Sequence, residues 1–129
     1  MTVVDADVLI AHHRGIDSAR DWLIDARKRG PLAISVVSIA EIAGGMRSTE
    51  RREIWRLLGS FRSEPVTDVI ARRAGEFTRR YRCCHSGIGL GDYLIAATAD
   101  VKGLQLATLN VRHFPMFKAL QPPFAMTSE

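Results

Sequence analysis

The stretch Thr2-Val3-Val4-Asp5-Ala6-Asp7 decides the first element of the fold, because an apolar run stops there on two acids. A short run rich in β-branched residues is typical of a strand that is buried on both faces. We therefore predict a strand at 2–4 with Asp5 directly after it. A helix is predicted to start at Val8, with Asp7 as its N-cap.

Similar apolar runs return further along the chain. Residues 32–35 and 106–108 are predicted to be buried strands, and Pro65-Val66 a short fourth one. Three helical patterns lie between them, with the apolar stripes Ala19, Trp22, Leu23 and Ala26, then Ile54, Leu57, Leu58 and Phe61, then Ile70, Ala74, Phe77 and Tyr81. Two more helices are predicted at about 38–42 and 92–101, and the second is apolar nearly all round and therefore buried.

Strands that alternate with helices indicate an α/β fold, with helices on both faces of a short, mostly parallel sheet. We predict a three-layer α/β/α sandwich. The 129 residues suffice for one domain, spanning 1–129, with residues 121–129 as a loosely ordered tail.

Composition narrows the class of protein. No apolar run approaches the roughly 20 residues of a membrane helix, and the start of the sequence does not resemble a signal peptide. We therefore expect a cytoplasmic protein with no membrane partner. The only cysteines, Cys83 and Cys84, are neighbours, so they cannot form a disulfide framework, and the histidines show no zinc-ligand spacing with them.

Positive charge is concentrated in one segment. Between Arg47 and Arg82 there are ten arginines and no lysines against five acids, so this segment carries +5 in a chain of net charge +4. A basic segment beside a mildly acidic remainder suits a phosphate backbone. The alternative is that these arginines only form the solvated faces of amphipathic helices.

Acidic and amide side chains follow the predicted strands. Asp5 follows the first strand, Glu41 lies early in the helix after the second, Asp92 opens the buried helix, and Asn110 follows the last strand. In parallel α/β sheets, ligands bind beyond the carboxyl ends of the strands. We therefore expect these residues to form one site.

Each acid also has a purely structural interpretation. Ser38 and Glu41 have the spacing of a capping box, and Asp92 follows Gly89-Leu90-Gly91 as an N-cap would. The pattern of residues by itself leaves capping and catalysis both open.

Converging carboxylates favour one chemistry. Mg²⁺ and Mn²⁺ prefer oxygen ligands and keep several waters. Such a metal lowers the pKa of a bound water and neutralises charge that builds up on a phosphorus atom. Without a cation, crowded carboxylates repel one another and one of them takes up a proton.

Four blocks of the sequence resemble PIN domains, in the right order and spacing over nearly the whole chain. They are Val3–Ile10, Ile34–Glu41, Leu90–Ala99 and Leu106–Phe114. The short length resembles VapC-type toxins of bacterial toxin–antitoxin pairs. This resemblance implies a PIN-like fold and an endoribonuclease that cuts RNA, often transfer or ribosomal RNA, with Mg²⁺ or Mn²⁺. It also implies homodimers and a VapB-type antitoxin.

The resemblance assigns roles to particular residues. Asp5, Glu41 and Asp92 match the catalytic, metal-binding acids of the family. Supporting or substrate-contacting roles are expected for Ser38, Thr108, Asn110, Arg112 and His113. Two departures stand out: Asn110 and His113 occupy a block where many members carry a further acid, and Asp7 replaces a more usual Ser, Asn or Thr. For Asp7 we favour the role of helix cap over that of a fourth carboxylate.

Two other functions compete with this one. Asp5-Ala6-Asp7 after a strand also resembles haloacid-dehalogenase-like phosphatases, in which Asp5 would be the nucleophile. Those enzymes need a lysine and a paired late acid, whereas this chain has only three lysines and offers Asn110. The other alternative is a catalytically inactive PIN module that binds RNA or a partner protein.

Overall fold

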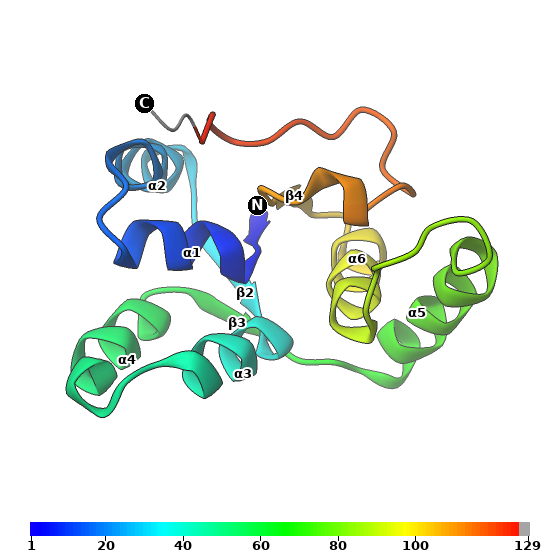
Figure 1. Ribbon diagram of the computed structural model, residues 1–129, viewed down its shortest axis with the longest axis horizontal. Helices are drawn as coiled ribbons and strands as arrows, with labels where there is room; N and C mark the ends of the chain where they lie inside the picture. The colour runs from blue at the N-terminus through cyan, green and yellow to red at the C-terminus, as the bar shows by residue number, and fades with distance from the viewer. Residues whose placement is uncertain (127–129) are drawn as a thin grey trace.

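The computed structural model describes residues 1–126 and contains four short strands, six α-helices and two 3₁₀ turns in that range (Figure 1). In chain order they are β1 (Thr2–Val4), α1 (Ala6–His13), α2 (Asp17–Arg29), β2 (Leu32–Ser35), α3 (Val36–Gly45), η1 (Ser48–Glu50), α4 (Arg51–Gly59), β3 (Arg62–Glu64), α5 (Asp68–Tyr81), α6 (Leu90–Lys102), β4 (Gln105–Ala107) and η2 (Val111–His113).

The strands form one sheet in the order β3-β2-β1-β4, and every pairing is parallel. Val4 at the end of β1 pairs with Ala107 at the end of β4, and Ser35 pairs with Glu64 in the same way. The carboxyl ends of all four strands therefore meet at one edge of the sheet. The predicted α/β fold is confirmed.

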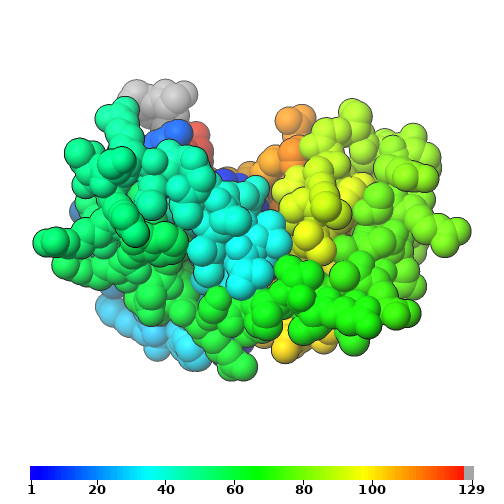
Figure 2. Space-filling model, turned by 90° about the horizontal axis from the view of Figure 1, so that it is seen from below, coloured from blue at the N-terminus to red at the C-terminus, as the bar shows by residue number. Residues whose placement is uncertain are grey.

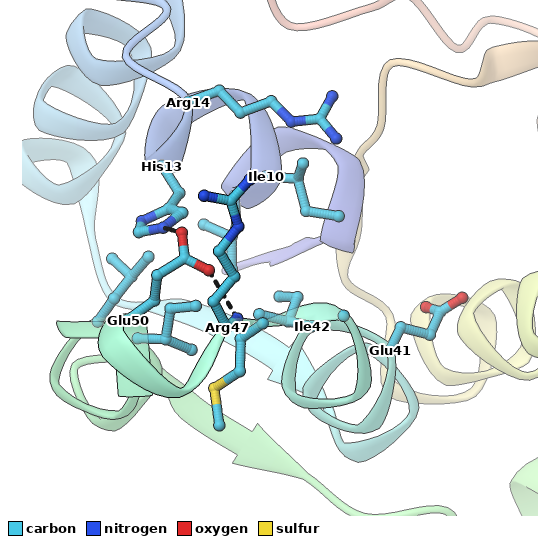
Figure 3. Close-up of a pocket in the computed structure, with 12 residues that line it drawn as sticks. Ile10, His13, Arg14, Glu41, Ile42, Arg47 and Glu50 are labelled. Carbon is cyan, nitrogen blue, oxygen red and sulfur yellow. Dashed lines mark hydrogen bonds and ion pairs between the residues drawn. The ribbon is translucent and has the colours of Figure 1, made fainter. Parts of the chain in front are cut away.

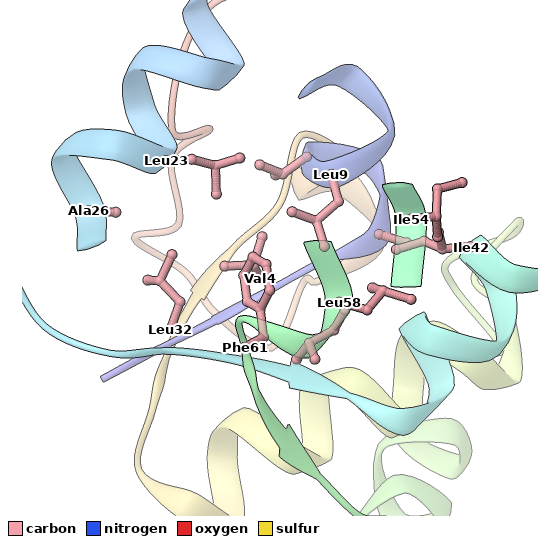
Figure 4. Packing of buried hydrophobic residues seen from close by; sticks show 12 residues of the cluster. Val4, Leu9, Leu23, Ala26, Leu32, Ile42, Ile54, Leu58 and Phe61 are labelled. Atoms are coloured by element: carbon pink, nitrogen blue, oxygen red, sulfur yellow. The ribbon is translucent and has the colours of Figure 1, made fainter. Parts of the chain in front are cut away.

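Alternate strand residues face opposite layers, as the two-residue period of a strand requires. Val4 and Ile34 pack into a cluster with side chains of α1, α2 and α4 (Figure 4). Val3 and Ala33 pack on the other face against Ala99 of α6. Figure 1 shows the same division, with α1–α4 on one side and α5 and α6 on the other.

The buried character predicted for the last long helix is confirmed in α6. Its buried side chains surround most of the helix: Tyr93, Ile95, Ala96, Ala97, Thr98 and Ala99. The small alanines let α5 and the sheet approach closely. Because α6 is fixed on several sides, the position of Asp92 in its first turn is fixed as well.

The fourth strand was predicted at the wrong place. It is β3, Arg62–Glu64, rather than Pro65-Val66. Its residues are polar because β3 is an edge strand, and only Glu64 is buried, paired with Arg62 at 3.2 Å. Phe61 was assigned to a helix stripe, but α4 ends at Gly59 and Phe61 is buried from the following turn.

The chain end is described only in part. Residues 121–126 form no helix or strand, and Phe124 packs against the cluster on the α1–α4 side. The rest of the predicted loose tail, 127–129, lies outside the described residues. No helix within 1–126 combines the length and apolar character needed to cross a membrane.

Candidate active site

Asp5 connects β1 to α1 and is buried, with 6 % of its surface exposed. Its backbone N–H donates to the carbonyl of Ala107 at 2.9 Å, which extends the pairing of β1 with β4. Its Oδ1 accepts from the N–H of Ala6 at 2.8 Å, so Asp5 itself is the N-cap of α1. The carboxylate therefore has one fixed orientation at the edge of the sheet.

Asp7 is not the cap that we predicted. It lies in the first turn of α1, and its Oδ2 accepts from the backbone N–H of Leu109 at 3.0 Å. Its Oδ1 is buried and has no hydrogen-bond partner among the residues described. Asp7 thus joins α1 to the end of β4 and adds a fourth carboxylate to the site.

Thr108 connects the two aspartates. Its fully buried hydroxyl lies 2.8 Å from Asp5 Oδ2 and 3.2 Å from Asp7 Oδ2, and it accepts from the N–H of Asn110 at 3.1 Å. One hydroxyl hydrogen serves one carboxylate at a time, so each aspartate keeps spare acceptor capacity. Thr108, for which the sequence predicted a supporting or substrate-contacting role, thus contacts both aspartates.

Glu41 approaches from α3, on the exposed side of the site. The helix starts at Val36 because Ser35 is its N-cap, accepting from the N–H of Val37 at 3.1 Å. The capping box of Ser38 and Glu41 was therefore wrong. Ser38 is instead buried inside the helix, and its hydroxyl has no partner in the part of the chain described.

Asp92 approaches from the first turn of α6. The N-cap is Gly89, whose N–H donates to Asp92 Oδ2 at 3.3 Å, so the prediction of Asp92 as N-cap was also wrong. Its Oδ2 lies 2.9 Å from Nδ1 of His113. A side chain on Gly91 would lie 3.4 Å from Val37 and 3.7 Å from Glu41 Oε2, so the first turn of α6 lies beside α3 here.

The carboxylates perturb one another. Burial, and then the charge of Asp7, raise the pKa of Asp5 from 3.8 to about 7. Burial raises the pKa of Asp7. Burial, and then the charges of Asp92 and Asp7, raise the pKa of Glu41. The four acids therefore form one electrostatic cluster, in which a cation would offset the repulsion.

The donor set fits a hard divalent cation. It offers only oxygen ligands, and the buried Oδ1 of Asp7 has no partner within 1–126. Among the described residues, no three His, Cys, Asp or Glu side chains already converge on one point, so metal binding would require these carboxylates to move closer together. Mg²⁺ or Mn²⁺ is thus compatible with the chemistry of the site.

The site lies in a notch of the surface. Figure 2 shows this notch between α3, in cyan, and α6, in yellow, with blue N-terminal and orange C-terminal segments at its base. The turn η2 and its N-cap residue Asn110 carry the remaining predicted residues. Arg112 is exposed there, whereas Asn110 and His113 contact each other.

The model of the PIN domain matches residues 2–118 of this chain. The chain belongs to the PIN domain family. The match spans all four of the sequence blocks that resemble PIN domains.

Individual relatives of this PIN domain are similar over almost their whole length. Ribonuclease VapC10 of Mycobacterium tuberculosis is 72% identical over 98% of this chain and 95% of its own. Ribonuclease VapC19 of the same species is 40% identical over 96% of this chain and 100% of its own.

Solved structures share the fold of this PIN domain. A toxin–antitoxin complex from Klebsiella pneumoniae aligns with a TM-score of 0.78 at 24% identity, over 96% of this chain and 98% of the other. The structure of FitAB bound to a DNA fragment aligns with a TM-score of 0.81 at 18% identity, over 99% of both chains.

This PIN domain also has a pocket of about 440 Å³ directly beside Glu41 (Figure 3). Side chains of α1, α3 and the η1–α4 segment line it: Leu9, Ile10, Ile42, Met46, Ile54 and Leu57 form its apolar wall. Its polar rim includes Arg14 and Arg47, and a pair in which His13 Nε2 lies 2.7 Å from Glu50 Oε2. This pocket could not be predicted from the sequence, because its lining comes from three separate segments.

Proposed function

We propose that this PIN domain is a metal-dependent endoribonuclease and the toxin of a toxin–antitoxin pair. The crowding of Asp5, Asp7, Glu41 and Asp92 at one edge of the sheet carries the proposal, since such a cluster suits a cation and a phosphate together. The 72% identity to a protein named Ribonuclease VapC10 supports the same reaction and the same role.

Asp5, Glu41 and Asp92 would hold Mg²⁺ or Mn²⁺. The bound metal supplies an activated water and neutralises charge on the phosphodiester. Asp5 is held in place by the N–H of Ala6 and the hydroxyl of Thr108, which limits the reorganisation that ligand binding requires. Asp7 adds negative charge behind it and tethers the end of β4 through Leu109.

The arginines divide into two groups by their ion pairs, and this division supports a particular assignment of RNA contacts. Arg62, Arg72 and Arg73 pair with Glu64, Asp68 and Asp100 at 3.2, 2.7 and 2.7 Å. The other arginines of the basic segment have no ion-pair partner within 1–126: Arg47, Arg51, Arg52, Arg56, Arg79, Arg80 and Arg82. We assign RNA affinity to this second group and to Arg112, which lies on η2.

A VapB-type antitoxin is the proposed protein partner. The apolar wall of the pocket suits an amphipathic segment, and an arginine of that segment would pair with the neighbouring carboxylates without any metal. Of the helix stripes predicted from the sequence, Ile54 and Leu57 line this pocket, whereas Leu23, Leu58 and Phe61 are buried in the core and do not line it. Homodimerisation and a cytoplasmic location complete the proposal.

Cleavage assays separate the three candidate functions. The purified protein should cut RNA with Mg²⁺ or Mn²⁺, lose the activity in excess EDTA, and regain it when metal is restored. Turnover of a small phosphomonoester without RNA cleavage would favour the phosphatase. RNA binding without cleavage by the intact site would favour the inactive module.

A further inference from the structure

Asp92 owes its orientation to two residues from the other side of the site. Its Oδ2 lies 2.9 Å from Nδ1 of His113, and the amide of Asn110 reaches the same nitrogen with its Nδ2 at 2.8 Å. Within residues 1–126, the only other hydrogen-bond partner of this carboxylate is the N–H of Gly89, at the longer distance of 3.3 Å. The side chains of Asp92 and His113 are 23% and 30% exposed, so water does not replace these contacts fully.

The direction of the hydrogen bond follows from chemistry. An ionised carboxylate only accepts, so Nδ1 of His113 carries the hydrogen and donates it to Asp92. The side-chain amide of Asn110 is then flipped by 180°, so that its oxygen accepts a hydrogen bond from the same Nδ1–H. In the neutral ring Nε2 remains an acceptor.

The backbone of its own turn orients the imidazole, and Gly87 lies nearby on the other side. On its own side, the N–H of Asn110 donates to the Thr108 hydroxyl, the N–H of His113 donates to the carbonyl of Asn110 at 3.0 Å, and Phe114 is fully buried next to it. On the opposite side lies Gly87, with a φ of 86°, where an added side chain would lie 3.8 Å from Nε2. Asp5, Thr108, Asn110, His113 and Asp92 thus form one connected chain of contacts across the site.

We propose that Asn110 and His113 are positioning residues, which hold the Asp92 carboxylate ready to bind metal without adding a further negative charge to the cluster. This inference rests on the proposed function of the site. A further acid on η2 would hold a metal directly, but it would repel Asp92. The ring of His113 instead donates to Asp92, and the amide of Asn110 contacts the ring without adding a charge. Hydrogen-bond partners of metal ligands typically change metal affinity 10–100-fold when removed.

The test measures Mn²⁺ affinity by calorimetry in the absence of RNA, together with kcat and KM for RNA cleavage. His113→Ala should weaken Mn²⁺ binding by roughly 10–100-fold and lower kcat, with KM for RNA within about threefold of wild type. His113→Asn should recover most of both losses, because its amide N–H replaces the Nδ1 hydrogen. Asn110→Ala should weaken Mn²⁺ binding several-fold.

The matched control is His85→Ala. His85 is an exposed histidine that packs its ring edge against Tyr81, and it has no contact with Asp92. This variant should keep wild-type Mn²⁺ affinity, kcat and KM. Urea unfolding of all variants in EDTA identifies any loss that comes from a weakened fold.

Two results would overturn the inference: wild-type Mn²⁺ affinity in His113→Ala, or a His113→Asn protein as impaired as His113→Ala. An equal loss in the His85 control would overturn it too. These readouts are separate from the proposed function. If the wild-type protein cleaves no RNA, the proposed activity fails, and the Mn²⁺ affinities still decide the role of His113 and Asn110.

Discussion

The acid cluster has a buried half and an open half. Asp5 and Asp7 lie behind Thr108, hydrogen-bonded to the backbone of two elements, and the pKa of Asp5 is raised to about 7. Glu41 and Asp92 lie on opposite walls of the notch, and Glu41 is exposed. Burial of the charged carboxylates in the first half destabilises the fold but holds them in fixed positions. The side chains of the open half can adjust to a ligand.

Cleavage should depend on both halves equally, and this is the largest expected effect. Asp5→Asn, Glu41→Gln and Asp92→Asn should each lower kcat by about a thousandfold, since each removes a charged ligand while keeping the shape of the side chain. Single-turnover cleavage of a defined RNA measures it. If kcat of the Glu41→Gln protein lay within tenfold of the wild-type kcat, the open half would not be needed for cleavage.

Stability should depend much more on Asp5 in the buried half than on Glu41 in the open half. In EDTA at pH 8, Asp5→Asn should raise the free energy of unfolding by up to about 4 kcal/mol, because it removes a charge whose pKa rises from 3.8 to about 7 on folding. Glu41→Gln should change it by less than about 0.5 kcal/mol, as exposed substitutions usually do. Urea unfolding measures both, and equal effects would abolish the distinction between the halves.

The same difference predicts a pH dependence. The folded protein holds the Asp5 proton up to about pH 7, whereas the unfolded chain releases it near pH 4. Between these values the folded state binds more protons, so the metal-free protein should lose stability as the pH rises. The raised pKa values of Asp7 and Glu41 act in the same direction, and the lowered pKa of His12 acts against it.

Comparison with Asp5→Asn isolates the contribution of Asp5. Unfolding curves in EDTA from pH 4 to pH 8 should show a shallower slope for the variant than for wild type. Identical slopes would show that the proton on Asp5 does not distinguish the folded from the unfolded state.

Metal should bridge the two halves. Mn²⁺ at about 100 times its Kd should stabilise the wild-type protein by about 2.7 kcal/mol. At the same concentration, Glu41→Gln and Asp5→Asn should each show a smaller rise in Tm. The charge-preserving variant Glu41→Asp should recover part of the rise in Tm. If Mn²⁺ stabilised both neutral variants as much as the wild-type protein, Glu41 and Asp5 would not be metal ligands.

The smallest effect concerns the arginines around the open half. Arg47 lies on the rim of the pocket beside Glu41, whereas Arg72 is paired with Asp68. With the site inactivated by Asp92→Asn, Arg47→Ala should reduce the salt dependence of RNA binding by about one phosphate contact. Arg72→Ala should leave that salt dependence unchanged. If both variants showed the same dependence of RNA affinity on salt, Arg47 would not contact the RNA.

Several features could be read directly from the sequence. The apolar runs located β1, β2 and, within one residue, β4, and the alternation of strands with helices indicated a parallel sheet. That placed Asp5, Glu41, Asp92 and Asn110 at one edge, because the carboxyl ends of parallel strands coincide there. These features depend on local patterns and on one general rule of topology.

Only the tertiary structure decided which partner each polar group meets. Ser35 and Gly89 cap helices that Ser38 and Asp92 were predicted to cap, and β3 was hidden because its residues are polar. Asp7 binds Leu109, and Asp92 contacts His113, through bonds between residues 102 and 21 positions apart. Such contacts depend on how β4 aligns with β1 and how α6 packs, which is set by burial over the whole core and leaves no local pattern in the sequence.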